Sequence, residues 1–336
     1  MIKMSDSKEK LLNLNEGRTL AYSENGNASS STVVIFFHGV FGIGDASKLS
    51  RTLVAKNVHY VAPTLPGWGN SSPLPSSTSY PCGLLSDITA LINHLHPSDA
   101  DLKLYVCGGS YGTVPAQIIY GASFDVFPLG RQIAGLLLIA PFSPFRWHKD
   151  YTKCMTLPNY IMFGLGYKVP FRLLPRLAVF AIRGKVKTPE KAEKFIRNTL
   201  FDNMGEEERA AFAIWRDTEG RAEGQLEREM AENVARSVEK TWDGLLEVTD
   251  VLHGDWGYRP DTLDEGHVRR PILIVTSTGD KMAGSGMANW LVANYKNARL
   301  KSVVGGHLAA LFHIDEIWTD FLEREPRTEG SSESCY

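Results

Sequence analysis

The chain lacks the marks of several large protein classes. Its four cysteines (Cys82, Cys107, Cys154 and Cys335) show neither the C-x-x-C spacing of zinc sites nor a disulfide framework. It has no run of 18 uncharged apolar residues, which argues against a membrane-spanning helix. The N-terminal stretch MIKMSDSKEKLLNLNEG has no long apolar core, so we expect no secretory signal peptide. These absences favour a reducing, cytoplasmic setting.

The chain also lacks a large excess of charge. A net charge of -2 over 336 residues offers no general attraction to nucleic acid or to an anionic membrane. No basic tract is suited to phosphate contacts. What is present is the composition of a globular protein, with 43% hydrophobic and 22% charged residues. We expect a small molecule as its partner, and the oligomeric state is left open.

Short apolar runs rich in Val and Ile recur along the chain. Each is bounded by Gly, Pro or polar residues, which is typical of strands buried on both faces of a parallel sheet. Segments of helical length lie between them, so the sequence predicts an α/β fold with a mostly parallel sheet. The predicted strands are 33–37, 59–63, 104–107, 134–141, 271–275 and 300–304, and the helical segments are 47–57, 82–96, 283–296 and the stripe after His307.

The alternation of strands and helices breaks between residues 142 and 245. Apolar residues recur there at helical spacing, as in Leu226, Met230, Val234 and Val238. The simplest interpretation is a helical cap inserted between two strands of the sheet. This divides the chain into a core (1–141 and 246–325), a cap (142–245) and a flexible tail (326–336), with cap helices over 195–204, 206–220 and 225–246.

One motif carries a chemical hypothesis. Residues 107–113 read CGGSYGT, a G-x-S-x-G pattern that follows a predicted strand and precedes a predicted helix. This is the context of a nucleophile elbow, in which Gly108 and Gly112 remove side chains that would clash around Ser110. We therefore expect Ser110 to be a nucleophile. The alternative is an ordinary serine in a glycine-rich loop.

A serine nucleophile needs a base, and the base needs a carboxylate. His307 follows the last predicted strand in VVGGHLAAL, and Asp280 follows the strand before it. Both are expected at the carboxyl edge of the sheet, beside Ser110. Asp280 could instead cap the next helix, which leaves Asp255 and Asp250 as rival acids. The backbone N–H groups of Val40 and Tyr111 are expected to form an oxyanion hole.

The order Ser110, Asp280, His307 resembles that of the α/β-hydrolase superfamily. Three further stretches resemble its members: GRTLAYSENG (17–26), APTLPGWGNSSP (62–73) and DWGYRP (255–260). The resemblance implies an eight-stranded sheet with a helical cap, and a structural role for His38 and Gly39 bracing the oxyanion loop. It departs where Thr64 replaces the usual acidic residue. A serine in place of an aspartate disfavours the epoxide hydrolase and haloalkane dehalogenase branches.

We predict a serine hydrolase that cleaves a carboxylic ester with an apolar acyl part through an acyl-enzyme on Ser110, without metal or organic cofactor. A prolyl iminopeptidase-type aminopeptidase, a lyase or cyclase, and a ligand receptor are the alternatives. The apolar stretch 160–182 is interpreted as pocket lining, membrane contact or packing of the cap onto the core. The glutamates of 206–229 alternate with arginines, so the sequence favours a salt-bridged surface there over an amine-binding site.

Overall fold

The computed structural model describes residues 8–97 and 101–323, so the predicted tail lies outside the described residues. Its centre is an eight-stranded sheet with the order β1-β2-β4-β3-β5-β6-β7-β8. The first two pairs in this order are antiparallel and all others are parallel. The strands are β1 Lys10–Asn13, β2 Thr19–Gly26, β3 Thr32–Phe37, β4 His59–Pro63, β5 Lys103–Gly109, β6 Ile133–Ile139, β7 Ile272–Ser277 and β8 Ala298–Val303.

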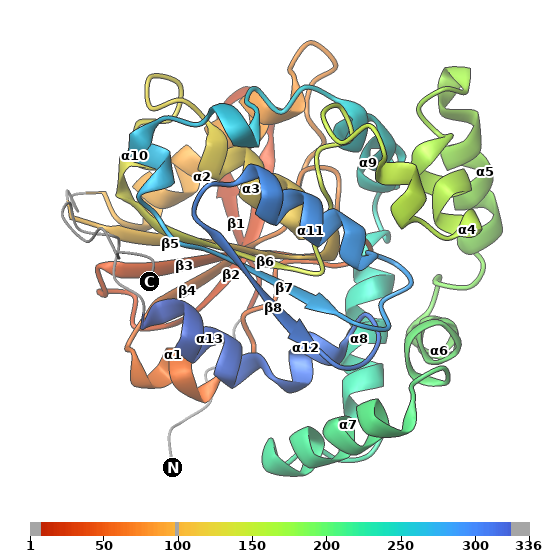
Figure 1. The fold of residues 1–336 in the computed structure, drawn as a ribbon. Helices are drawn as coiled ribbons and strands as arrows, with labels where there is room; N and C mark the ends of the chain where they lie inside the picture. The colour runs from red at the N-terminus through yellow and green to blue at the C-terminus, as the bar shows by residue number, and fades with distance from the viewer. Residues whose placement is uncertain (1–7, 98–100, 324–336) are drawn as a thin grey trace, which may run out of the picture.

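Both faces of the sheet are covered by helices, so this is an α/β fold as predicted (Figure 1). Along β3, Val33 and Ile35 belong to one buried cluster and Val34 to the other, because successive side chains of a strand point to opposite faces. Helices of the first face are α2 Tyr80–Leu95, α3 Thr113–Gly121, α10 Glu265–Val268 and α11 Ser285–Asn294; those of the second are α1 Arg51–Ala55, α12 Ala309–Phe312 and α13 Ile314–Leu322.

The helix predicted over 47–57 is shorter than expected. It begins only after Ser50, whose hydroxyl accepts a hydrogen bond from the Leu53 N–H and so caps α1. The other core helices predicted from periodicity are present, including α2 and α11.

Between Ile139 and Ile272 the described chain forms helices and no strand. We therefore keep the division into core and cap as a prediction and refer to residues 142–245 as the helical segment. No helix among the described residues is long and apolar enough to cross a membrane. The helices here are α4 Leu157–Asn159, α5 Leu173–Ile182, α6 Pro189–Ile196, α7 Glu206–Thr218, α8 Gln225–Ser237 and, crossing its end, α9 Asp243–His253.

The single helix predicted over 225–246 is wrong, because α8 ends at Ser237. The Ser237 carbonyl accepts the N–H of Gly69, which belongs to the loop after β4, at 2.7 Å. The Thr241 hydroxyl then accepts the Asp243 N–H at 3.1 Å, at the start of α9. A tertiary contact with the loop after β4 therefore lies where the expected helix would continue.

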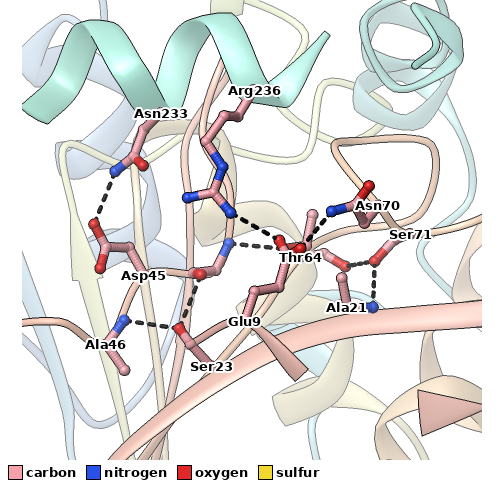
Figure 2. A network of polar contacts seen from close by, with 11 residues as sticks. Glu9, Ala21, Ser23, Asp45, Ala46, Thr64, Asn70, Ser71, Asn233 and Arg236 are labelled. Atoms are coloured by element: carbon pink, nitrogen blue, oxygen red, sulfur yellow. Dashed lines mark hydrogen bonds and ion pairs between the residues drawn. The ribbon is translucent and has the colours of Figure 1, made fainter. Parts of the chain in front are cut away.

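Polar side chains of α8 bind the loops around the sheet's edge (Figure 2). The Asn233 amide donates to Asp45 at 2.8 Å, and the Arg236 guanidinium pairs with Glu9 at 3.4 Å. Both core residues lie far from α8 in the sequence. The first contact joins α8 to the loop after β3, and the second joins it to the residue that precedes β1.

The same network holds the loop after β3 against the loop after β4 (Figure 2). The buried Thr64 hydroxyl accepts the Gly44 N–H at 2.9 Å. The Ser23 hydroxyl donates to the Gly44 carbonyl and accepts the Ala46 N–H. The family resemblance led us to expect that the contact of the usual carboxylate is missing at Thr64. The Thr64 hydroxyl instead satisfies the buried N–H of Gly44.

We predict that Thr64→Val destabilises the protein by about 1–3 kcal/mol, because the isosteric side chain leaves the Gly44 N–H buried without an acceptor. The free energy of unfolding in urea measures this loss. Thr64→Ser, which keeps the hydroxyl, is the matched control and should cost less. An unchanged free energy of unfolding in Thr64→Val would show that this hydrogen bond does not stabilise the protein.

Candidate active site

Ser110 lies on a sharp turn between β5 and α3, the strand–turn–helix context that the sequence predicted. Its φ is 52°, a conformation that non-glycine residues rarely adopt. A Cβ on Gly108 would lie 2.1 Å from the Gly112 carbonyl oxygen, and one on Gly112 would lie 2.1 Å from that of Phe37. Both positions therefore require glycine. The turn presents Ser110, which is half-buried, at the carboxyl edge of the sheet.

A buried polar contact that the sequence did not reveal secures this turn. The Thr113 hydroxyl donates to the Ser110 carbonyl at 2.6 Å and accepts the Phe142 N–H at 3.1 Å. The Gln117 amide donates to the Phe142 carbonyl at 2.8 Å. The start of the helical segment is therefore bonded directly to the turn that carries Ser110.

The loop after β3 packs against the same turn. Gly42 N–H donates to the Gly39 carbonyl at 3.1 Å, closing a tight turn in which Phe41 has a φ of 61°. A Cβ on Gly39 would lie 3.3 Å from the Ser110 Cβ, so the two backbones are close. Among the described residues, the Val40 N–H has no hydrogen-bond acceptor, which suits a donor reserved for a ligand.

His38 joins this loop to the loop after β4. Its Nε2 accepts the Leu65 N–H at 3.0 Å, so Nδ1 carries the proton and donates to the Gly39 carbonyl at 2.8 Å. Burial lowers the pKa of His38 to about 4. Protonation would place a second N–H against that of Leu65, so the neutral form is required by the geometry.

Asp280 and His307 form a close pair. The Nδ1 of His307 lies 2.8 Å from Asp280 Oδ2, which leaves Nε2 as the free basic nitrogen. The other oxygen, Oδ1, accepts the N–H groups of Met282 and Ala283 at 2.7 and 3.0 Å. Asp280 therefore also caps a turn, as the alternative interpretation suggested, and this turn holds its carboxylate in place.

The two loops that carry this pair are bonded to each other. The N–H groups of Thr278 and Gly279 donate to the carbonyls of Val303 and Gly305 at 3.0 and 2.8 Å. No hydrogen bond joins Ser110 Oγ to His307 in the described structure. Such contacts in unliganded sites often tighten only when substrate binds.

The rival acids lie elsewhere. Asp255 pairs with Arg146 and Asp250 with Arg172, and all four side chains are exposed. Neither aspartate contacts His307. Within residues 8–97 and 101–323, no three His, Cys, Asp or Glu side chains are grouped as a metal ion would require.

Glu208 departs from the salt-bridged surface expected for the glutamates of 206–229. Glu219 and Glu229 do pair with Arg51 and Arg221. Glu208, however, is only 5% exposed and makes no hydrogen bond or ion pair with a described residue.

Glu208 lies beside the turn that precedes His307. A Cβ on Gly306 would lie 3.3 Å from both of its carboxylate oxygens. Glu208 belongs to the first turn of α7. No sequence signal distinguishes it from Glu206 and Glu207.

Aromatic rings gather next to the turn at Val40. Phe41, which follows Val40, meets the rings of Trp68, Phe195 and Trp242 edge-on, with centroids 6.0 to 6.5 Å away. Phe195 and Trp242 belong to the helical segment. This cluster gives the candidate site an apolar neighbourhood.

Residues 34–318 match the profile of the Alpha/beta hydrolase family. No curated protein matches the chain in sequence. Three solved structures are similar in fold. An alpha/beta hydrolase fold protein from Chitinophaga pinensis is 14% identical with a TM-score of 0.61, and the match covers 94% of this chain and 98% of that one. A hydrolase from Pseudomonas aeruginosa PA01 is 14% identical with a TM-score of 0.58, covering 95% of this chain and 100% of that one. A thermophilic esterase from Thermogutta terrifontis is 15% identical with a TM-score of 0.53, covering 94% of this chain and 97% of that one.

We predict that His38 makes the stability of the protein fall below neutral pH. Folding lowers the pKa of His38 from 6.5 to about 4. The contribution of the neutral side chain to the free energy of unfolding is therefore complete above pH 6.5 and is lost as the pH falls toward 4. Between about pH 7.5 and about pH 4.5, the wild type should lose about 2–3 kcal/mol more unfolding free energy than His38→Gln, measured in urea. Equal losses would contradict a neutral His38.

Proposed function

The chain belongs to the alpha/beta hydrolase family, and we propose that it is a serine hydrolase with Ser110, His307 and Asp280 as its catalytic residues. The observation that carries this proposal is the Asp280–His307 pair at the sheet edge where Ser110 stands on its strained turn. The family contains enzymes, and a serine, a histidine and a carboxylate at one edge of the sheet support this assignment of a nucleophile, a base and an orienting group.

In this mechanism His307 Nε2 takes the proton of Ser110, and Oγ attacks the substrate carbonyl carbon. Asp280 keeps the Nδ1 proton in place and stabilises the imidazolium that forms. The N–H groups of Val40 and Tyr111 bind the oxyanion, and losing one such donor costs about 3–4 kcal/mol in comparable sites. His307 then protonates the leaving group, and water hydrolyses the acyl-enzyme.

Two observations support a carboxylic ester with an apolar acyl part. The aromatic cluster around Phe41 adjoins the proposed oxyanion hole. One of the similar structures is named as an esterase. The helical segment would act as a cap, since it contributes Phe195 and Trp242 to this cluster and is bonded to the Ser110 turn through Phe142.

We predict that Ser110→Ala abolishes ester hydrolysis, with kcat at least about 1000-fold lower, because no other group can form the acyl-enzyme. Initial rates on p-nitrophenyl esters of increasing acyl length measure this loss of kcat. The preferred acyl length of the wild type indicates the length of the acyl pocket. The matched control is Ser143→Ala, which removes a buried hydroxyl that hydrogen-bonds His148 rather than a triad residue. Full activity in Ser110→Ala would refute the mechanism.

A second candidate, an aminopeptidase that binds a protonated substrate amine, is favoured by Glu208. A buried carboxylate without a described cationic partner lies beside the turn of His307, where an amine could provide the missing charge. The carbonyl chemistry at Ser110 would be the same for an amide bond.

We predict that, if this candidate holds, Glu208→Gln raises KM for a prolyl-arylamide about 10- to 100-fold, because a charge-assisted hydrogen bond is lost. Turnover of an uncharged ester should change little. Glu207→Gln, one residue away on the exposed side of α7, is the control. An unchanged KM, or no prolyl-arylamide turnover at all, would exclude the aminopeptidase and leave the esterase.

A further inference from the structure

The outer part of the helical segment presents large apolar side chains to solvent. They lie on α4, the turn after it, and α5, which stand at the edge of the molecule (Figure 1). Phe171 is 86% exposed, Leu157 70% and Phe180 68%. We call these residues the apolar patch: Leu157, Ile161, Tyr167, Phe171, Leu173, Leu177 and Phe180.

The opposite side of the same elements is anchored to the protein. The Asn159 amide donates to the carbonyls of Lys281 and Met282 at 3.0 and 3.1 Å. His253 Nε2 lies 2.9 Å from the Phe163 carbonyl. Packing of the helical segment therefore accounts for its inner side but leaves the patch uncovered by any described residue.

The stretch of sequence that carries the patch has charged residues of one sign only. Residues 151–189 contain no Asp or Glu and carry seven basic residues: Lys153, Lys168, Arg172, Arg176, Arg183, Lys185 and Lys187. Arg172 pairs with Asp250 at 2.7 Å. Lys168, Arg176, Arg183, Lys185 and Lys187 are exposed, and none forms an ion pair with a described residue. The Arg183 guanidinium lies 4.9 Å from the Phe180 ring centre, so apolar and basic groups share one surface.

This combination selects among possible occupants of the patch. A second copy bound to this surface by two-fold symmetry would bring the positive regions of the two copies close together. Protein interfaces in general are depleted of lysine. A membrane surface with anionic lipids suits both features, because exposed Phe and Leu enter the acyl boundary while Lys and Arg bind the phosphates.

We propose that the apolar patch and its flanking basic residues dock this protein on the surface of a membrane that contains anionic phospholipids. The docking is peripheral, and it does not require Ser110. It goes beyond the proposed hydrolase chemistry, which could act on a dissolved ester. The net charge of the whole chain is -2, so it gives no sign of this local positive surface.

The test is co-sedimentation of the full-length protein with vesicles of phosphatidylcholine alone and of phosphatidylcholine mixed with phosphatidylglycerol. We expect binding to the mixed vesicles that weakens as salt is added, and little binding to phosphatidylcholine alone. Ser110→Ala should bind like the wild type. Loss of esterase activity with binding intact, or the reverse, therefore separates this proposal from the proposed function.

Matched variants test the patch itself. Phe180→Ser should weaken partition into the mixed vesicles about tenfold. Ile214→Ser, which removes an equally exposed side chain (68%) on α7 outside the basic stretch, should leave it unchanged. Arg176→Gln should weaken binding about fivefold. Turnover of a soluble ester checks that each variant is folded.

Three outcomes would overturn the proposal. They are absence of binding to the mixed vesicles, equal effects of Phe180→Ser and Ile214→Ser, and a wild-type dimer in sedimentation equilibrium that Phe180→Ser dissociates. The last result would assign the patch to a second copy of this chain.

Discussion

The candidate site depends on how closely the turn at Ser110 approaches the end of β3. At Gly108 and Gly112 a single methyl group would overlap backbone carbonyl oxygens 2.1 Å away. Because β3 and β5 are paired neighbours, with Phe37 opposite Gly108, this contact sets the position of the loop that follows β3. Val40, whose N–H is free of described partners, is therefore held near Ser110 by backbone packing rather than by side chains that could rotate away.

The sheet and the local structure around the three proposed catalytic residues could be predicted because each depends on local sequence. Strands buried on both faces appear in the sequence as short apolar runs. The reason is visible in β3, whose successive side chains enter two different buried clusters, one on each face of the sheet. The turn at Ser110 needs glycines at fixed offsets, and His307 and Asp280 follow directly after their strands. Parallel strands bring their carboxyl ends to one edge of the sheet, so the topology places these residues at the same edge.

What escaped prediction depends on contacts between distant segments. α8 ends at Ser237, whose carbonyl accepts a hydrogen bond from the N–H of Gly69 in the loop after β4. Glu208 is buried although its neighbours in the sequence are alike in type, because only it faces the turn at Gly305 and Gly306. Periodicity identifies an apolar side of α5 but cannot say whether that side faces a partner within the chain. Phe180 shows that it faces outward.

The apolar patch and the candidate site meet at one short loop. Asn159, between the exposed side chains of α4 and the turn after it, binds the Met282 carbonyl, and the Met282 N–H binds Asp280 Oδ1. The other oxygen of Asp280 holds His307. Three hydrogen bonds thus connect the outermost part of the helical segment to the proposed base. The surface of the proposed membrane contact and the carboxylate of the proposed triad therefore share one structural support.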